Sequence, residues 1–215
     1  MYRSFIYVCA TINAGAGAFV GTFGTGVALR GVVWDGTSIW VANYGSNTVS
    51  KINPATGGII LNTPTGSGPY FMAAEPVSGD IWIANRNSNS ITVVAPSGAL
   101  VRTIFTAGEP QLIANNGNMW VTCYSAGKIQ EFSAQTGALI LSVNSPDGGP
   151  TGMSIGQAGN LYVATNSGYV FGIRTDGSTF ANTNIGGDHI GILGEQVDSF
   201  VWTANTGKGF IERLQ

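Results

Sequence analysis

The sequence predicts an all-β fold, a five-bladed β-propeller of four-stranded antiparallel blades, and three observations support this prediction. An aromatic residue followed by a short run of β-branched or small residues recurs about every 40 residues. A pair of apolar residues follows each aromatic at a nearly constant distance. Strand-like runs alternate with turn sequences along the chain, and no segment has the apolar period of a capped helix.

The recurring aromatic residues mark one position in each repeat. They begin the runs WVAN, WIAN, WVTC, YVAT and WTAN, at Trp40, Trp82, Trp120, Tyr162 and Trp202. The apolar pairs that follow are Val49/Ile52, Ile91/Val94, Ile129/Phe132, Val170/Ile173 and Ile211/Leu214. Turn glycines recur at Gly57, Gly98, Gly137 and Gly177. One large aromatic side chain per repeat is typical of the core between blades, so we expect the tryptophans to be buried there.

Each repeat divides into four short strands separated by turn sequences. In the first repeat the strands are Leu29–Trp34, Ser38–Asn43, Thr48–Asn53 and Gly58–Asn62, with the turns DGTS, YGSN and PATG. Four antiparallel strands in about 40 residues make one propeller blade. The sequence therefore predicts a single domain over 1–215, with an N-terminal closing segment (1–26) and repeats at about 27–66, 67–106, 107–147, 148–186 and 187–215.

The ends of the chain predict how the ring would close. The last repeat stops after its third strand, whereas Gly17–Phe23 (GAFVGTF) matches the fourth strands GALVRTI and GALILSV. We expect this N-terminal strand to pair in the last blade, which would hide two sheet edges. Tyr7–Asn13 and Phe210–Gln215 both resemble a third strand. The one left over would lie on an outer edge or pair with another protein chain by strand addition.

Composition excludes several classes of partner. Charged residues make up 9% of the chain, the net charge is -2, and no cluster of Lys and Arg occurs, which argues against nucleic acids and anionic membrane surfaces. No run approaches the length of a membrane span, and the apolar run near the N-terminus is short for a signal peptide. Cys9 and Cys123 lack metal-ligand spacing, so we expect two buried free thiols.

The segment WVANYGSNTVSKINPATG, from Trp40 to Gly57, resembles the repeat of YVTN-type propellers and, more loosely, the streptogramin lyase and NHL-type propellers. All five repeats share this resemblance, which implies the propeller fold. These families include lyases, scaffolds and surface proteins, and they usually carry six or seven blades. The streptogramin lyases, as a family, use a metal together with histidine and glutamate near the central channel. This chain has one histidine, His189, which disfavours that activity.

Loops that lead into the inner strands converge at the channel mouth of a propeller, which makes this face the expected ligand site. The residues that the sequence places there could hold a small polar ligand such as a sugar, with an aromatic ring stacking on it. They are Arg30, Tyr70, Glu109, Gln111, Thr151, Asp188 and His189. We expect no catalytic residue, metal or cofactor. Asn43, Asn85 and Asn166 end second strands and are expected to cap turns.

The sequence favours a non-enzymatic propeller that serves as a structural or interaction module, outside the cell or in an assembly such as a phage virion. Its low-charge surface, rich in Ser, Thr and Asn, its surplus strand and its lack of a catalytic constellation support this interpretation. The first alternative is a lectin-like propeller that binds a carbohydrate or another small molecule. The second is a degenerate lyase or lactonase, which would hold a metal.

Overall fold

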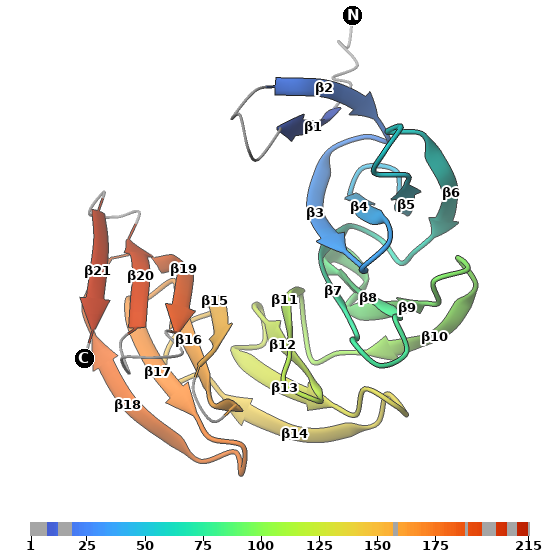
Figure 1. Cartoon of the computed structure of the whole chain (residues 1–215). Coiled ribbons are helices and arrows are strands. Elements are labelled where there is room, and N and C mark those ends of the chain that lie inside the picture. Colours follow the sequence, from blue (N-terminus) through green and yellow to red (C-terminus); the bar gives the residue numbers. More distant parts are fainter. Residues whose placement is uncertain are drawn as a thin grey trace, which may run out of the picture. The chain divides into compact units, whose positions relative to one another are not determined.

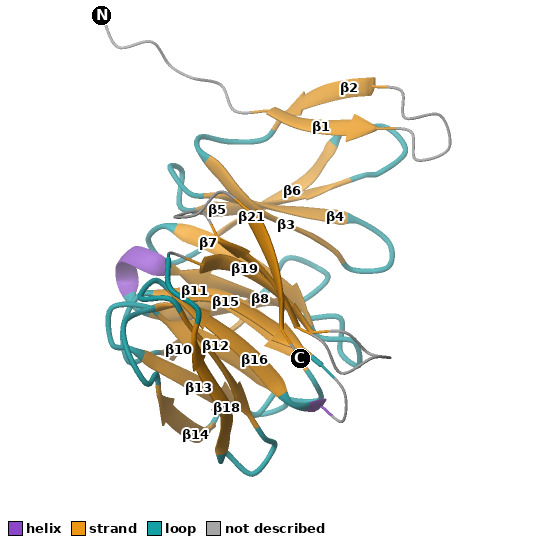
Figure 2. Ribbon diagram, turned by 90° about the vertical axis from the view of Figure 1, so that its left-hand side faces the viewer, coloured by secondary structure: helices purple, strands orange, loops and turns teal. Residues whose placement is uncertain are grey.

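The regular secondary structure of the described residues consists almost entirely of β-strands (Figure 2). The structure, a computed structural model, describes residues 8–12, 19–156, 159–187, 189–194, 201–205 and 210–214, with side chains for 24–156 and 159–187. A short 3-10 helix, η1 (Arg86–Ser88), follows one of the strands. Over the described ranges no helix has the length and apolar character needed to cross a membrane.

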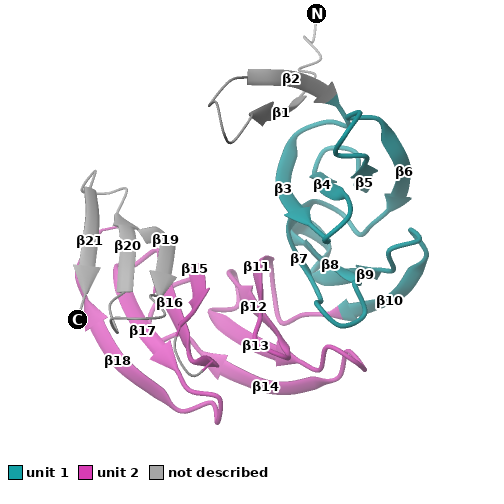
Figure 3. Cartoon of the chain, in the orientation of Figure 1, with its two compact units in different colours: residues 1–104 teal, residues 105–215 magenta. Residues whose placement is uncertain are grey.

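The chain divides into two compact units, residues 1–104 and 105–215 (Figure 3). Unit 1 holds a two-stranded sheet and two four-stranded sheets (Figure 1). The two-stranded sheet consists of β1 (Val8–Ile12) and β2 (Phe19–Gly24). Blade 1 consists of β3 (Leu29–Trp34), β4 (Ile39–Asn43), β5 (Thr48–Ile52) and β6 (Ile59–Pro64). Blade 2 consists of β7 (Pro69–Ala74), β8 (Ile81–Asn85), β9 (Ser90–Val94) and β10 (Leu100–Phe105).

Unit 2 holds two further four-stranded sheets and a three-stranded sheet. Blade 3 consists of β11 (Pro110–Asn115), β12 (Met119–Cys123), β13 (Lys128–Phe132) and β14 (Leu139–Asn144). Blade 4 consists of β15 (Pro150–Ile155), β16 (Leu161–Thr165), β17 (Tyr169–Ile173) and β18 (Thr179–Asn184). The three-stranded sheet consists of β19 (His189–Gly194), β20 (Val201–Asn205) and β21 (Phe210–Leu214).

This arrangement confirms the all-β propeller architecture and corrects the predicted number of complete blades from five to four. β2, which contains most of Gly17–Phe23, pairs with β1, and the last sheet has three strands, all C-terminal. Pairing β2 with its neighbour in sequence closes a loop of about 6 residues instead of about 190, which saves about 3 kcal/mol of chain entropy. The predicted closure by the N-terminal strand is therefore not seen.

The N-terminal hairpin has the register of the outer half of a blade. Val8 pairs with Gly24 and Ile12 with Phe19, just as Thr48 pairs with Pro64 and Ile52 with Ile59 in blade 1. The register also shifts at the matching place, between Thr11 and Ile12 as between Lys51 and Ile52. Both competing segments are thus third strands, β1 of the hairpin and β21 of the last sheet. Strand addition by another chain stays a prediction.

The core lies on the second and third strands of the blades. Trp40, Trp82 and Trp120 are fully buried, as the repeat predicted, and β8, β9 and β12 are buried along their whole length. In contrast, the fourth strands expose most of their residues. Strands covered on both faces need apolar residues at successive positions, which explains runs such as WVA and WIA.

Polar groups inside this core pair across the second and third strands. Asn43 Nδ2 donates to Ser50 Oγ over 2.8 Å, and Asn85 Nδ2 donates to Thr92 Oγ1 over 2.8 Å. In blade 3 the thiol of Cys123 donates to Gln130 Oε1 over 3.3 Å. The predicted turn-capping role of Asn43 and Asn85 is therefore wrong, because both side chains are buried and bond to the neighbouring strand.

Asp35, in the turn between β3 and β4, organises blade 1. Its Oδ1 accepts from the backbone amides of Thr37 and Ser38 over 2.7 and 2.6 Å, and its Oδ2 accepts from Trp40 Nε1 over 2.7 Å. Lys51 Nζ lies 3.6 Å from Oδ2, and the Asp35 side chain is 3% exposed. Burial raises the pKa of this carboxyl, but the hydrogen bonds from Trp40, Thr37 and Ser38 outweigh it and hold the pKa well below its usual range.

We expect Asp35→Asn to lower the free energy of unfolding at neutral pH by about 1–3 kcal/mol, because an amide cannot accept the bonds that both carboxylate oxygens accept. The carboxyl binds a proton more weakly in the folded chain than in the unfolded chain. Its contribution to the free energy of unfolding is therefore complete at neutral pH and declines as the pH falls below about 4. Urea unfolding across this pH range should show that acid lowers the free energy of unfolding less in the variant than in the wild type. Equal losses would contradict the assignment.

A tyrosine after a second strand contacts an asparagine of the next blade in each unit. Tyr44 Oη donates to Asn87 Oδ1 over 3.1 Å, between blades 1 and 2. Asn166 Nδ2 donates to Tyr124 Oη over 2.9 Å, between blades 3 and 4. The same polar contact thus joins neighbouring sheets in both units.

We expect Tyr44→Phe and Tyr124→Phe each to lower the free energy of unfolding by about 0.5–1.5 kcal/mol, since each removes one hydrogen bond and keeps the ring. A double-mutant cycle with Asn87→Ala measures the pairwise part for Tyr44. Tyr169→Phe is the matched control, because no side chain of the described residues bonds to that hydroxyl. A coupling of zero between Tyr44 and Asn87 would contradict the contact.

Candidate functional site

Four of the predicted site residues occupy one repeated position, the second residue of the first strand of a blade. Arg30 lies there in β3, Tyr70 in β7, Gln111 in β11 and Thr151 in β15. First strands of consecutive blades are neighbours within each unit, β3 beside β7 and β11 beside β15. The repeat thus presents a cationic, an aromatic, an amide and a hydroxyl side chain at equivalent places.

In unit 1 the predicted residues Arg30 and Tyr70 come together in a cluster of rings and cations. The Arg30 guanidinium lies 5.4 Å from the centre of the Tyr44 ring and 5.6 Å from that of Tyr70. Arg86 of η1 lies 5.5 Å from the centre of the Tyr70 ring. Tyr70 also packs edge-on against Tyr44 and Phe71. A cation beside an aromatic face is attracted by the ring quadrupole, so the aromatic rings hold the Arg30 guanidinium in place although the residue is exposed.

Glycine allows this cluster to form. A side chain at Gly31 would begin 2.6 Å from the backbone oxygen of Tyr70, so only a residue without Cβ lets β3 approach β7 this closely. Arg30 and Tyr70 are consequently brought into contact by the backbone beside them. No carboxylate of the described residues forms an ion pair with Arg30.

In unit 2 the predicted residues are placed by their strands and are partly buried. Thr151 Oγ1 donates to the backbone oxygen of Ala164 over 3.3 Å, so its hydroxyl proton is engaged within blade 4. Glu109 precedes β11, where its backbone amide donates to Ser125 Oγ and its backbone oxygen accepts from Tyr124. The sequence placed Glu109 at the channel mouth together with Gln111, and in the structure it directly precedes the first strand of blade 3.

The last two predicted residues belong to the end of the chain. His189 is the first residue of β19, and its backbone pairs with Asn205 of β20. Its side chain and the whole of Asp188 lie outside the described residues. Their predicted roles in ligand binding stay predictions.

The described side chains provide neither a metal centre nor an activated thiol. In the part of the chain with placed side chains, no three His, Cys, Asp or Glu residues lie close enough to hold a metal ion, so these residues do not fit the metal that the lyase resemblance implies. Burial raises the pKa of the Cys123 thiol to about 11, despite bonds from the Ala107 and Gly108 backbone. This thiol is free and buried, as expected, and stays protonated at neutral pH.

Sequence reasoning missed Tyr44 and Arg86. Both follow a second strand, where the repeat also places Tyr124 and Asn166. The recurrence of a large polar residue directly after the second strand was a usable signal, but it was assigned to turns.

No protein-family model and no curated protein sequence matches the chain. Solved structures do. A catalytically inactive histidine-to-alanine variant of virginiamycin B lyase from Staphylococcus aureus, with quinupristin, matches with a TM-score of 0.85 at 19% identity, over 99% of this chain and 75% of that one. Selenomethionine-substituted virginiamycin B lyase from Staphylococcus aureus matches with a TM-score of 0.74 at 17% identity, over 88% and 70%. Kuenenia stuttgartiensis hydrazine synthase matches with a TM-score of 0.73 at 16% identity, over 82% of this chain and 55% of that one.

These matches correct the functional prediction. The non-enzymatic structural or interaction module is contradicted by the likeness to a lyase, and the second alternative, a lyase-like propeller, is better supported. The virion, interaction and lectin-like roles gain no support from the matches. The chain is a β-propeller repeat protein that is structurally similar to virginiamycin B lyase.

Proposed function

We propose that the chain is a lyase-like propeller enzyme that opens a small cyclic or ester-containing molecule by elimination. The observation that supports this most is the backbone likeness, over 99% of the chain, to the quinupristin-bound virginiamycin B lyase variant. The cluster of Arg30, Tyr44 and Tyr70 within unit 1 provides a second argument, because ligand sites combine ring surfaces with a few directed polar groups.

His189 is the proposed general base. In an elimination the base removes a proton from carbon, the C–H electron pair forms a double bond, and the neighbouring C–O pair leaves with the oxygen. An imidazole with a pKa near neutrality suits this proton transfer. The chain contains a single histidine, and in the staphylococcal lyase a histidine-to-alanine change gives a catalytically inactive protein.

The chain is incubated with quinupristin and the products are separated and weighed by mass spectrometry, with and without added divalent cation. An intramolecular elimination opens a ring without changing its mass, whereas hydrolysis adds one water. We expect a ring-opened product of unchanged mass, and a loss of about 100-fold or more in kcat for His189→Ala. Absence of turnover in every condition would refute the proposal, and full activity of His189→Ala would refute the assignment of the base.

A further inference from the structure

The outer hairpin of blade 4 differs from those of blades 1 and 3. In these two blades the extra residue of the fourth strand, Ile60 or Ile140, lies opposite the end of the third strand. In blade 4 the shift falls between Val170 and Gly172, so that Ala181 and Asn182 lie opposite Phe171. Ala181 has a φ of 49°, a left-handed conformation that alanine rarely adopts. Bulges and strained residues of this kind concentrate beside functional sites.

The residue opposite the bulge is also exceptional. The middle of the third strand is a buried polar residue in three blades, namely Ser50, Thr92 and Gln130. Blade 4 has Phe171 there, 1% exposed. Blade 4 therefore lacks the polar pair between its middle strands and instead places an aromatic ring beneath the bulge.

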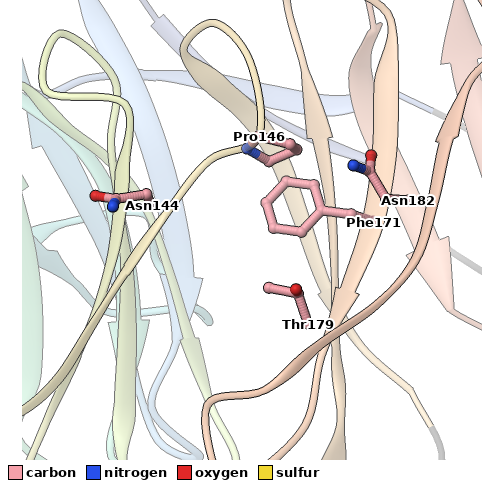
Figure 4. Close-up of a pocket in the computed structure, with 5 residues that line it drawn as sticks. All are labelled: Asn144, Pro146, Phe171, Thr179 and Asn182. Carbon is pink, nitrogen blue, oxygen red and sulfur yellow. The ribbon is translucent and has the colours of Figure 1, made fainter.

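A pocket opens at this place, between the outer strand of blade 3 and blade 4 (Figure 4). Its volume is about 130 Å³, and its lining residues are Asn144, Pro146, Phe171, Thr179 and Asn182. Figure 4 shows Phe171 at the centre of this group, with Asn144 on the left, Asn182 on the right, Pro146 above the ring and Thr179 below it. All five residues belong to unit 2.

Several side-chain donors and acceptors that line the pocket form no hydrogen bond with the described residues. No side chain or backbone group of the described residues bonds to the side chains of Asn182 and Thr179. Asn144 Oδ1 accepts from Lys128 Nζ over 2.9 Å, which holds the amide by its oxygen and leaves its two N–H groups for a ligand. The rim thus offers two amides and one hydroxyl, which supply donors and acceptors together.

The chemistry of the lining selects the ligand. No lining residue is charged, so a neutral molecule fits better than an ion. The pocket is slightly smaller than the cavity of about 150 Å³ that accommodates benzene, and it is open to solvent, so a six-membered ring would enter it with one face and leave the rest in solvent. A pyranose has an apolar C–H face for Phe171 and Pro146 and a rim of hydroxyls for Asn144, Thr179 and Asn182. We propose that this pocket binds one neutral sugar ring.

The site is independent of the proposed lyase activity, because it uses none of the residues assigned to that reaction. Its test is a titration of the full, isotope-labelled chain with methyl glycosides of neutral hexoses, followed by backbone amide NMR. N-methylacetamide, a peptide-like amide, and a methyl glucuronide, an anionic sugar, are the comparison probes.

We expect saturable shifts at residues 179–182 with at least one neutral glycoside. Asn182→Ala and Thr179→Ala should each weaken this binding about threefold to tenfold, as the loss of one hydrogen bond does. Thr183→Ala is the matched control, an exposed threonine of the same strand outside the lining, and should bind as the wild type does. The absence of shifts with every glycoside, equal affinity in all variants, or tighter binding of N-methylacetamide or the glucuronide would overturn the proposal.

Discussion

The structure depends on the burial of the second and third strands of each blade on both faces. A strand in this position has no solvent side, so its side chains must be apolar or must satisfy one another. The tryptophan rings of Trp40, Trp82 and Trp120 meet the first condition, and the Asn43–Ser50 pair meets the second. Blade 2 is an exception, because Trp82 Nε1 and Asn85 Oδ1 are buried without a partner among the described residues, although Asn85 Nδ2 bonds to Thr92. The fourth strands, which expose most of their residues, are free to vary in sequence and in register.

This constraint explains which parts of the fold the sequence could predict. Full burial enforces an aromatic residue and β-branched neighbours at a fixed place in each repeat, so strand number and order within a blade could be read from spacing alone. Closure could not be read in this way. Tyr7–Asn13 and Gly17–Phe23 resemble the third and fourth strands of a blade. This resemblance is the same whether the two segments pair with each other as a hairpin or pair separately with other sheets. The choice depends on the entropy of closing a long loop, which leaves no mark in a local pattern.

The sequence predicted the residues of the candidate site that lie in the first strands of the repeats. It did not predict those that lie in the turns after the second strands. Arg30, Tyr70, Gln111 and Thr151 share a position in their blades, and the sequence placed all four where the chain leads into the inner strands. Tyr44 and Arg86 lie beyond the ends of the second strands, where the chain turns and the repeat is looser. Their contact with Arg30 and Tyr70 is set by the close approach of β3 and β7 at Gly31, a tertiary effect. Asn43 and Asn85 show the reverse error, since a residue type typical of turns is buried in the core.

The position of an extra residue in the fourth strand of a blade can change the surface of a repeat protein without changing its core. In blades 1 and 3 the extra residue of the fourth strand is an isoleucine that is exposed to solvent. In blade 4 the extra residue lies at another place along the fourth strand, next to the pocket. The inner strands need not change for this. A repeat protein could therefore gain or lose a binding surface through a one-residue change of register in the fourth strand of a blade. The buried second and third strands would keep the fold unchanged.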